Sequence, residues 1–540
     1  MQTSSLVPTW KWRTWSIILA LAAISIVAWG ILLRLSVPKW PWIAPDSGYY
    51  LEPALNGGHY YIGPRTFVYP MFCRLAMFGT AHLEAVSMAQ RALGLLGPIL
   101  LFLAWTRLAM QIWKSAWGRA LHQALGLAIL FLLVPSSISI IYEQEVLLEG
   151  INGFLQCVLG ALLCLLWLPL PPLRRRLLAC CAASLGVFMY YANPRWGAAA
   201  LVVVVIAALA PVAAGDSVWR RLRATGPVIL AVLIAAVSLE FAQRRIVYYN
   251  PWDDTFTAKH LLWMHADLAI NEFRRDLAAP IPPKNAALLR KMIAKVEEQI
   301  VGRGTSHWRT ITYNANALLY IADNPDVNLA NAFPNDPDGY RRFCLRYYFR
   351  IIIHQPRAYW GEVWSMLAYY YSGPLDDGAF REGDFDVPQQ LQASVGMARN
   401  FANQDALPAF RPRLLAEAAV MDRLAATPAF FHSNFRYIQI VQCVHQLFLP
   451  VTLAGAACAI LVLSLRRLRA LRSLAMLASI GLGSIAVLFA QVLTLAMVTV
   501  TEGRYADALR PLATFSLVCA FAMIGSALIH LRSIVRSVRS

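Results

Sequence analysis

The chain has 540 residues, of which 58% are hydrophobic and only 14% are charged. Because soluble domains carry about 25% charged residues, this composition excludes an ordinary soluble protein and predicts an integral membrane protein. The net charge of +18 does not indicate nucleic-acid binding, since Lys and Arg gather in short blocks between apolar runs, as they do in cytoplasmic loops.

Ten stretches are apolar enough for helices that cross a membrane, since a core of about 30 Å needs about 20 residues. We therefore expect a mainly α-helical polytopic protein with about ten transmembrane helices. They are expected near residues 15–35, 85–107, 121–141, 149–168, 177–193, 196–214, 226–242, 438–463, 474–499 and 508–530. An even number of spans puts both termini on one side, and the basic blocks, such as Arg174–Arg176, then fall on that side. This predicts a cytoplasmic (inner) membrane protein with cytoplasmic N and C termini.

The spans divide the chain into three regions. Residues 1–242 contain seven spans and a first outer loop at 36–84, and residues 438–540 contain three spans. Between them, residues 243–437 are expected to form a soluble, mainly helical module on the outer, periplasmic side.

Shorter helices are predicted outside the spans. Apolar residues three and four apart mark Lys284–Ile300, Tyr340–Ile353 and Arg413–Leu424 in the module. Phe67–Phe78 is apolar but too short to span, which favours a helix in the membrane interface. Trp360–Tyr371 is aromatic enough to lie against the membrane or an acceptor, although packing inside the module explains it equally well.

Acids, arginines and tyrosines gather on the predicted outer side. A carboxylate near the membrane surface costs free energy unless it is paired or solvated, and an arginine can hold a phosphate through two hydrogen bonds. Tyrosine stacks on sugar rings but also populates the interfacial belt of membrane proteins. The candidates are Asp46, Glu52, Glu143 and Glu145; Arg65, Arg195 and Arg504; Tyr49, Tyr50 and Tyr505; and His59. Glu149 also lies on this side, where a solvated helix end explains it more simply.

Several motifs are absent from the sequence. It contains no CxxC pair and no HExxH, so a structural zinc site or a zinc protease has no support. It contains neither a GxGxxG after a strand nor a Walker loop, so a transferase of this sequence is not expected to use a nucleotide donor.

As a set, the segments PDSGYYLEPA, GPRTFVYP, IYEQEVLLEG, NPRW and EGRYADALRPL resemble the GT-C superfamily of integral-membrane glycosyltransferases. The closest resemblance is to the branch of the protein O-mannosyltransferases and the aminoarabinose transferase of lipid A. It implies transfer of a sugar from a polyprenyl-phosphate carrier to an acceptor on the outer side of the membrane. It also implies that Asp46 is the acid of the first loop and that Glu145 or Glu143 is the acid of the second.

Two features depart from that family. Ser47 stands where a second acid commonly follows the first, which leaves the use of a divalent metal ion open. The large module at 243–437 precedes the last spans instead of following them.

These residues predict an inverting single displacement on the outer face. Asp46 would accept the proton of the acceptor hydroxyl with help from Glu145, and arginines would hold the donor phosphate. The phosphate ligands would be Arg65, Arg195 and Arg504, and the substrate-binding residues Tyr49, Tyr50, Glu52, His59, Glu143 and Tyr505. Expected partners are a lipid-linked sugar donor, a glycan, lipid or protein acceptor, and membrane lipids, with no nucleic acid.

Two alternatives remain open. A transporter or flippase of lipid-linked saccharides would carry polar residues along a path at mid-membrane. A non-catalytic scaffold would use the 243–437 module to bind a partner.

Overall fold

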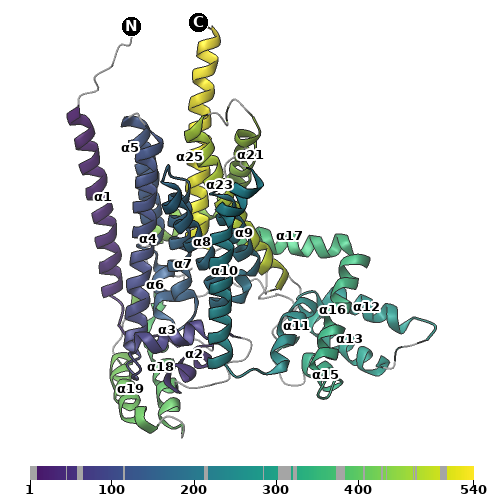
Figure 1. Cartoon of the computed structure of the whole chain (residues 1–540). Helices are drawn as coiled ribbons and strands as arrows, with labels where there is room; N and C mark the ends of the chain where they lie inside the picture. Colours follow the sequence, from purple (N-terminus) through teal and green to yellow (C-terminus); the bar gives the residue numbers. More distant parts are fainter. Residues whose placement is uncertain are drawn as a thin grey trace.

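Long helices stand side by side in a bundle, with a layer of short helices beneath one end and a helical unit at one side (Figure 1). The computed structural model describes residues 9–43, 46–56, 65–113, 116–211, 217–281, 283, 285–301, 318–319, 325–372, 384–404, 408–426, 430–432, 435–465, 468, 471–498 and 508–539. The bundle helices are α1 (Thr9–Leu35), α4 (Glu84–Ile112), α5 (Ala116–Leu133), α7 (Glu149–Leu166), α8 (Pro172–Ala192), α9 (Gly197–Leu209), α10 (Val218–Ile246), α21 (Phe448–Ser464), α23 (Arg472–Val498) and α25 (Arg510–Arg539).

Among the described residues, six helices are long and apolar enough to cross a membrane. They are Thr14–Leu35, Glu84–Ile112, Glu149–Leu166, Val218–Ile246, Ser473–Val498 and Arg510–His530. Two bent pairs raise the number to eight if each is one span: Gly118–Leu133 with Ser137–Gln144, and Gln439–Gln446 with Phe448–Ser464. The chain is therefore mainly helical, with the apolar helices of a membrane protein, and the predicted number of ten exceeds these six to eight.

Small residues let the bundle helices approach closely. A Cβ atom added at Gly97 of α4 would lie 3.1 Å from the Cβ of Cys157 in α7, and one added at Gly160 of α7 would lie 3.2 Å from the ring of Phe515 in α25. Helix packing inside a membrane depends on such van der Waals contact, because lipid tails are as apolar as the side chains. These glycines thus bring α4, α7 and α25 together.

The first outer loop folds into two short helices under the bundle. They are α2 (Gly48–Asn56) and α3 (Val68–Ala76), and α3 confirms the short helix predicted at Phe67–Phe78. Trp42, which is fully buried, pairs its backbone with the segment after α6 (Ser137–Gln144), with 2.8 Å from its N–H to the carbonyl of Gln144. This pairing fixes the start of the loop against the bundle.

The region 243–437 occupies two separate places (Figure 1). One part stands at the side of the bundle and consists of η2 (Pro251–Thr255), α11 (Phe256–Trp263), α12 (Ala266–Leu277), α13 (Ala286–Val301), α15 (Pro325–Asn331), α16 (Pro337–His354) and α17 (Pro356–Ser372). The other part consists of β1 (Asp384–Asp386), α18 (Val387–Ala402), η3 (Pro408–Phe410), α19 (Arg411–Ala425) and β2 (Phe430–His432), followed by α20 (Phe435–Gln446). The predicted helices Lys284–Ile300, Tyr340–Ile353 and Arg413–Leu424 are confirmed as α13, α16 and α19.

The α18 and α19 hairpin packs beneath the first loop instead of joining the side unit. The Ser394 hydroxyl donates to the carbonyl of Pro41 over 2.8 Å, and the buried carboxylate of Glu417 accepts from the N–H of Leu83 over 3.0 Å. The antiparallel strands β1 and β2 close the hairpin. A single module over 243–437 is therefore too simple a description, because its C-terminal third belongs with residues 36–84.

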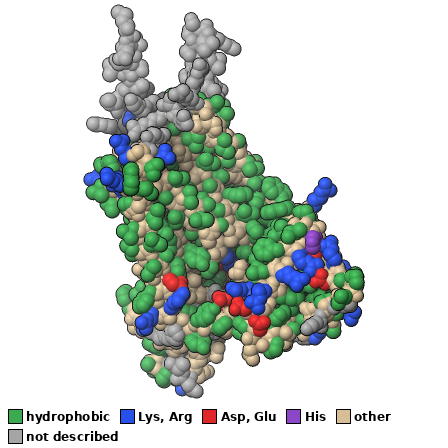
Figure 2. Space-filling view, turned by 45° about the vertical axis from the view of Figure 1, so that its right-hand side comes forward, with side chains coloured by type: hydrophobic (Ala, Val, Ile, Leu, Met, Phe, Trp, Pro, Cys, Tyr) green, Lys and Arg blue, Asp and Glu red, His purple; other side chains and the backbone are tan. Residues whose placement is uncertain are grey.

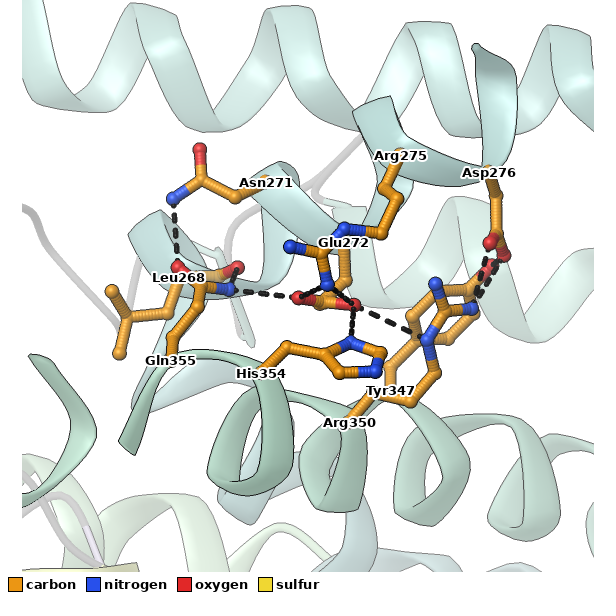
Figure 3. Close-up of polar contacts among 9 residues, drawn as sticks. All are labelled: Leu268, Asn271, Glu272, Arg275, Asp276, Tyr347, Arg350, His354 and Gln355. Atoms are coloured by element: carbon orange, nitrogen blue, oxygen red, sulfur yellow. Dashed lines mark hydrogen bonds and ion pairs between the residues drawn. The ribbon is translucent and has the colours of Figure 1, made fainter. Parts of the chain in front are cut away.

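A buried acid ties the side unit together (Figure 3). Glu272 of α12 has no exposed side-chain surface, and its carboxylate accepts from Arg275, from Arg350 and His354 of α16, and from Gln355. A buried charge is tolerated when it is paired and hydrogen-bonded on every side. The contacts hold α12 and α16 in one relative position.

A second buried cluster predicts a pH dependence of stability. Burial raises the pKa of Asp267 to about 7, with a further contribution from the charge of Glu362, and burial raises the pKa of Glu362 to about 7. Unfolded carboxyls titrate near pH 4, so between about pH 4 and pH 7 the folded state holds protons that the unfolded chain has released. The contribution of these two carboxyl groups to the free energy of unfolding therefore falls as pH rises from about 4 to about 7. His265, whose pKa burial lowers to about 4, acts in the opposite direction below about pH 6.5.

Asp267→Asn isolates the acid contribution, because Asn has the shape of Asp and carries no charge. We expect the variant to unfold at a higher temperature than wild type at pH 8, and this difference to become small at pH 4, where the carboxyl is protonated in the folded state and largely protonated in the unfolded chain. Differential scanning fluorimetry at both pH values measures this, with Asp338→Asn as the exposed control. An equal shift at both pH values would show that Asp267 does not titrate in this range.

Candidate active site

A cavity of about 910 Å³ lies where α2, α8 and α10 meet η2 and α11. Its polar lining residues are Asp46, Tyr50, Arg65, Thr66, Tyr69, Glu149, Tyr190, Tyr191, Asn193, Arg195, Glu240, Gln243, Arg244, Tyr248, Tyr249, Asp253, Asp254, Thr257, His260 and Thr494. The volume is at the upper end of the range for small-molecule sites, and charged groups of both signs converge in it.

Asp46 and Arg65 form an ion pair at the cavity wall. Asp46 lies two residues before α2 begins, and its Oδ1 is 2.9 Å from Nη2 of Arg65. Both side chains are partly exposed, and the Arg65 guanidinium also lies 4.2 Å from the ring centre of Tyr49. The pair places a carboxyl group and a guanidinium group side by side at the cavity.

Contacts to α8 and α10 hold the Arg65 segment in place. The Thr66 hydroxyl donates to the carbonyl of Ala192, which ends α8, over 3.3 Å. Gln243 of α10 accepts from the N–H of Phe67 over 2.9 Å and donates to the carbonyl of Arg65 over 3.3 Å. The first loop is thus attached to two bundle helices directly at the cavity.

Tyr50 and Tyr69 give the cavity an aromatic wall. Their rings meet edge to face with centres 4.8 Å apart, and the Tyr69 hydroxyl is hydrogen-bonded to Gln90. Burial raises the pKa of Tyr50 to about 12, so its hydroxyl stays protonated at neutral pH. A protonated phenol at the cavity can donate to a ligand oxygen.

The NPRW segment positions Arg195. Asn193 caps a short 3₁₀ helix, η1 (Pro194–Trp196), by accepting from the N–H of Arg195 over 3.1 Å, and Pro194 suits the first helical position. Trp196 is buried in the bundle and anchors the turn. Burial lowers the pKa of His260 to about 3, with smaller contributions from the positive charges of Lys259 and then Arg195, so that imidazole is neutral at pH 7.

The structure adds acids and a cation that the sequence did not single out. Glu240 of α10 accepts from the Tyr191 hydroxyl over 2.9 Å and from Arg244 over 2.6 Å, and all three line the cavity. Asp254 of η2 accepts from the Tyr249 hydroxyl over 2.5 Å. For Tyr249 and Asp254 the signal available in the sequence was the run VYYNPWDD, which begins at residue 247, shortly after the seventh predicted span ends at 242. Glu240 lies inside that predicted span.

Other predicted residues do not line this cavity. Glu143 is 3% exposed and its carboxylate makes two contacts with Arg34, of 2.7 and 2.5 Å, so it is engaged inside the bundle and does not face this cavity. Glu145 follows α6 in the segment paired with Trp42, and the nearby Glu149 lines the cavity in its place. Glu52 lies on the exposed side of α2.

The remaining predictions have mixed outcomes. Tyr49 is about half exposed and does not line the cavity, but its ring packs against Arg65, which does. His59, Arg504 and Tyr505 lie outside the described residues. Ser47 is buried and donates to the carbonyl of Val146 over 2.9 Å, so it is engaged with the backbone. In the part of the chain that the structure describes, no group of three or more His, Cys, Asp or Glu side chains is arranged to hold a metal ion.

Comparison of the chain with protein-family models, with curated proteins and with solved structures finds no match.

Proposed function

We propose that this protein is a membrane glycosyltransferase that moves a sugar from a polyprenyl-phosphate donor to an acceptor hydroxyl. The observation that carries the proposal is the cavity, where Asp46, Arg65 and Arg195 come together from distant parts of the sequence. An acid, two arginines and a tyrosine wall suit a ligand that combines a phosphate with a sugar. The resemblance of the outer segments to GT-C enzymes points to the same chemistry.

The proposed topology has ten spans, with α8 and Pro194–Leu209 crossing in addition to the six helices and two bent pairs. The cavity takes residues from the C-terminal ends of α8 and α10, whereas their basic blocks, Arg174–Arg176 and Arg220–Arg223, lie at the N-terminal ends. In Figure 2 the acids of the visible face lie in its lower part, with basic side chains among them, whereas the basic side chains near the upper end have no acids beside them. Under the positive-inside rule the termini are cytoplasmic and the cavity opens to the periplasm.

In the proposed reaction the acceptor oxygen attacks the anomeric carbon as the bond from that carbon to the phosphate oxygen breaks. The hydroxyl proton passes to the Asp46 carboxylate, and the bonding electron pair leaves on polyprenyl phosphate. Because a carboxylate is a weak base, its proton transfer accompanies bond formation. Arg195 and Arg65 stabilise the negative charge that develops on the leaving phosphate. A single displacement inverts the configuration.

Neutral groups around these charges suit the sugar. The hydroxyl of Tyr50 and the uncharged imidazole of His260 line the cavity and can hydrogen-bond to sugar hydroxyls. His260 and Asp253 come from the side unit, so that unit forms part of the cavity wall. Its contribution makes it a candidate for recognising the acceptor.

Arg195→Ala tests the assignment of the phosphate ligand. Loss of a charge-assisted hydrogen bond of about 1.5–3 kcal/mol predicts a fall in kcat/KM for the donor of roughly 10- to 100-fold. Initial rates with purified protein and a panel of polyprenyl-phosphate sugars measure it. Arg341→Ala, an exposed arginine of α16, is the matched control and is expected to behave as wild type. If both variants had the same kcat/KM for the donor, Arg195 would not be a ligand of the donor phosphate.

A further inference from the structure

An apolar ridge is exposed around the bend between α16 and α17. It consists of Phe349 and Ile353 in α16 and Trp360 and Trp364 in α17, whose exposed fractions are 55%, 71%, 51% and 56%. Within each helix the two residues are four apart and therefore share a face. Large exposed apolar groups in a cluster mark an interaction surface.

A second face of α17, next to the ridge, is buried. Tyr359 is fully buried, and its hydroxyl lies 2.5 Å from that of Tyr348 in α16. Val363 is 2% exposed on the same face. One side of α17 is therefore buried, and another side presents exposed aromatic residues. The ridge residues lie on the exposed side and do not fill the core of the side unit.

The ridge continues into the surface of the membrane helices. Trp364 lines an apolar groove of about 240 Å³ together with Leu453 of α21 and Phe489 of α23. Leu482 and Phe489 lie about 15 and 26 Å along α23 from Arg472, at 1.5 Å per residue, and a hydrocarbon core is about 30 Å thick. The Trp364 end of the ridge therefore lies at a depth that lipid occupies.

The orientation of α17 suits an interface. In Figure 1 α17 runs across the direction of the bundle helices, with the rest of the side unit below it. Leu453 of α21 is 57% exposed, so lipid-facing surface adjoins the groove directly. Exposed Arg357, in the first turn of α17, adds a cation next to the ridge that can meet lipid phosphate.

We propose that the ridge inserts into the outer leaflet, so that α17 is an interfacial helix that holds the side unit against the bilayer. Tryptophan at this position is typical of the membrane interface, where its ring meets both apolar chains and polar headgroups. A lipid surface fits better than a protein partner, because the ridge is continuous with the surface of the spans. Because the Glu272 contacts hold α12 to α16, α12 is held against the bilayer together with the ridge (Figure 3). This inference does not depend on the proposed enzymatic activity.

Spin-label accessibility in lipid nanodiscs tests the proposal on the full chain. The cysteines that are not buried, Cys180, Cys181, Cys443 and Cys458, are first replaced by Ser. Nitroxide labels are then placed singly by Ile353→Cys and Trp360→Cys. Asp338→Cys, at the far end of α16, is the control position in water.

We expect labels at 353 and 360 to collide more with oxygen than with a water-soluble nickel complex, and the label at 338 to show the reverse. Both tested side chains are mostly exposed, so the exchange removes little packing, and size-exclusion profiles verify folding. Nickel accessibility at 353 and 360 equal to that at 338 would overturn the proposal and favour a surface for a soluble partner.

Discussion

Asp46→Asn is expected to lower sugar transfer by about 10²- to 10⁴-fold, the range that general-base groups contribute. The amide has nearly the same shape as the carboxylate but cannot accept the acceptor proton at neutral pH. Its oxygen can still accept a hydrogen bond from Arg65, which lies 2.9 Å away in the wild type. The loss should therefore appear mainly in kcat, with donor KM changing less. Release of polyprenyl phosphate from the donor measures the rate.

Glu52→Gln is the matched control for Asp46→Asn. Glu52 belongs to the same first loop, lies exposed on α2, and does not line the cavity. Its replacement removes the same charge a short distance away, so it also controls for a general change in the electrostatic field. Turnover of Asp46→Asn equal to that of Glu52→Gln would exclude Asp46 as the base.

Glu143→Ala is expected to destabilise the fold by about 3–5 kcal/mol, the cost of leaving a buried charge without its partner. Arg34 is only 3% exposed, and besides Glu143 it donates to the carbonyls of Gly30 and Val134. Loss of the carboxylate would leave the guanidinium charge uncompensated between α1 and α6. The temperature of unfolding in detergent and the yield of monodisperse protein measure the effect.

The pair of Arg399 and Asp422 is the control for this stability prediction. Both side chains are 54% exposed, and exposed ion pairs contribute about 0–1 kcal/mol. Asp422→Ala should therefore leave the unfolding temperature close to that of wild type. An equally small change for Glu143→Ala would mean that solvent reaches Arg34 and that the pair does not join α1 to α6.

Part of the cavity could be predicted from residues that follow or precede apolar runs. Asp46, Arg65 and Arg195 were assigned to one side of the membrane by span counting alone, and the structure brings all three to one cavity. Helices with apolar positions three and four apart, such as α13 and α16, were located to within a few residues. Both results depend on local patterns, which a sequence displays directly.

The roles of residues that depend on contacts between distant parts of the sequence could not be predicted. The role of Glu143 is decided by Arg34, which is 109 residues away, and no local pattern marks that partner. His260 and Asp253 reach the cavity only because the chain turns after α10, so that η2 and α11 line the cavity and α11 contacts α23. The hairpin of α18 and α19 was likewise assigned to one module by sequence proximity, while its contacts, such as that of Ser394 with Pro41, belong to the first loop.

A structure of the protein in a lipid nanodisc with bound polyprenyl phosphate would show whether this cavity is the donor site. We expect the phosphate inside the cavity, within hydrogen-bonding distance of Arg195, with Asp46 facing the space that the sugar would occupy. A phosphate bound elsewhere, with the cavity empty at saturating lipid, would contradict this expectation.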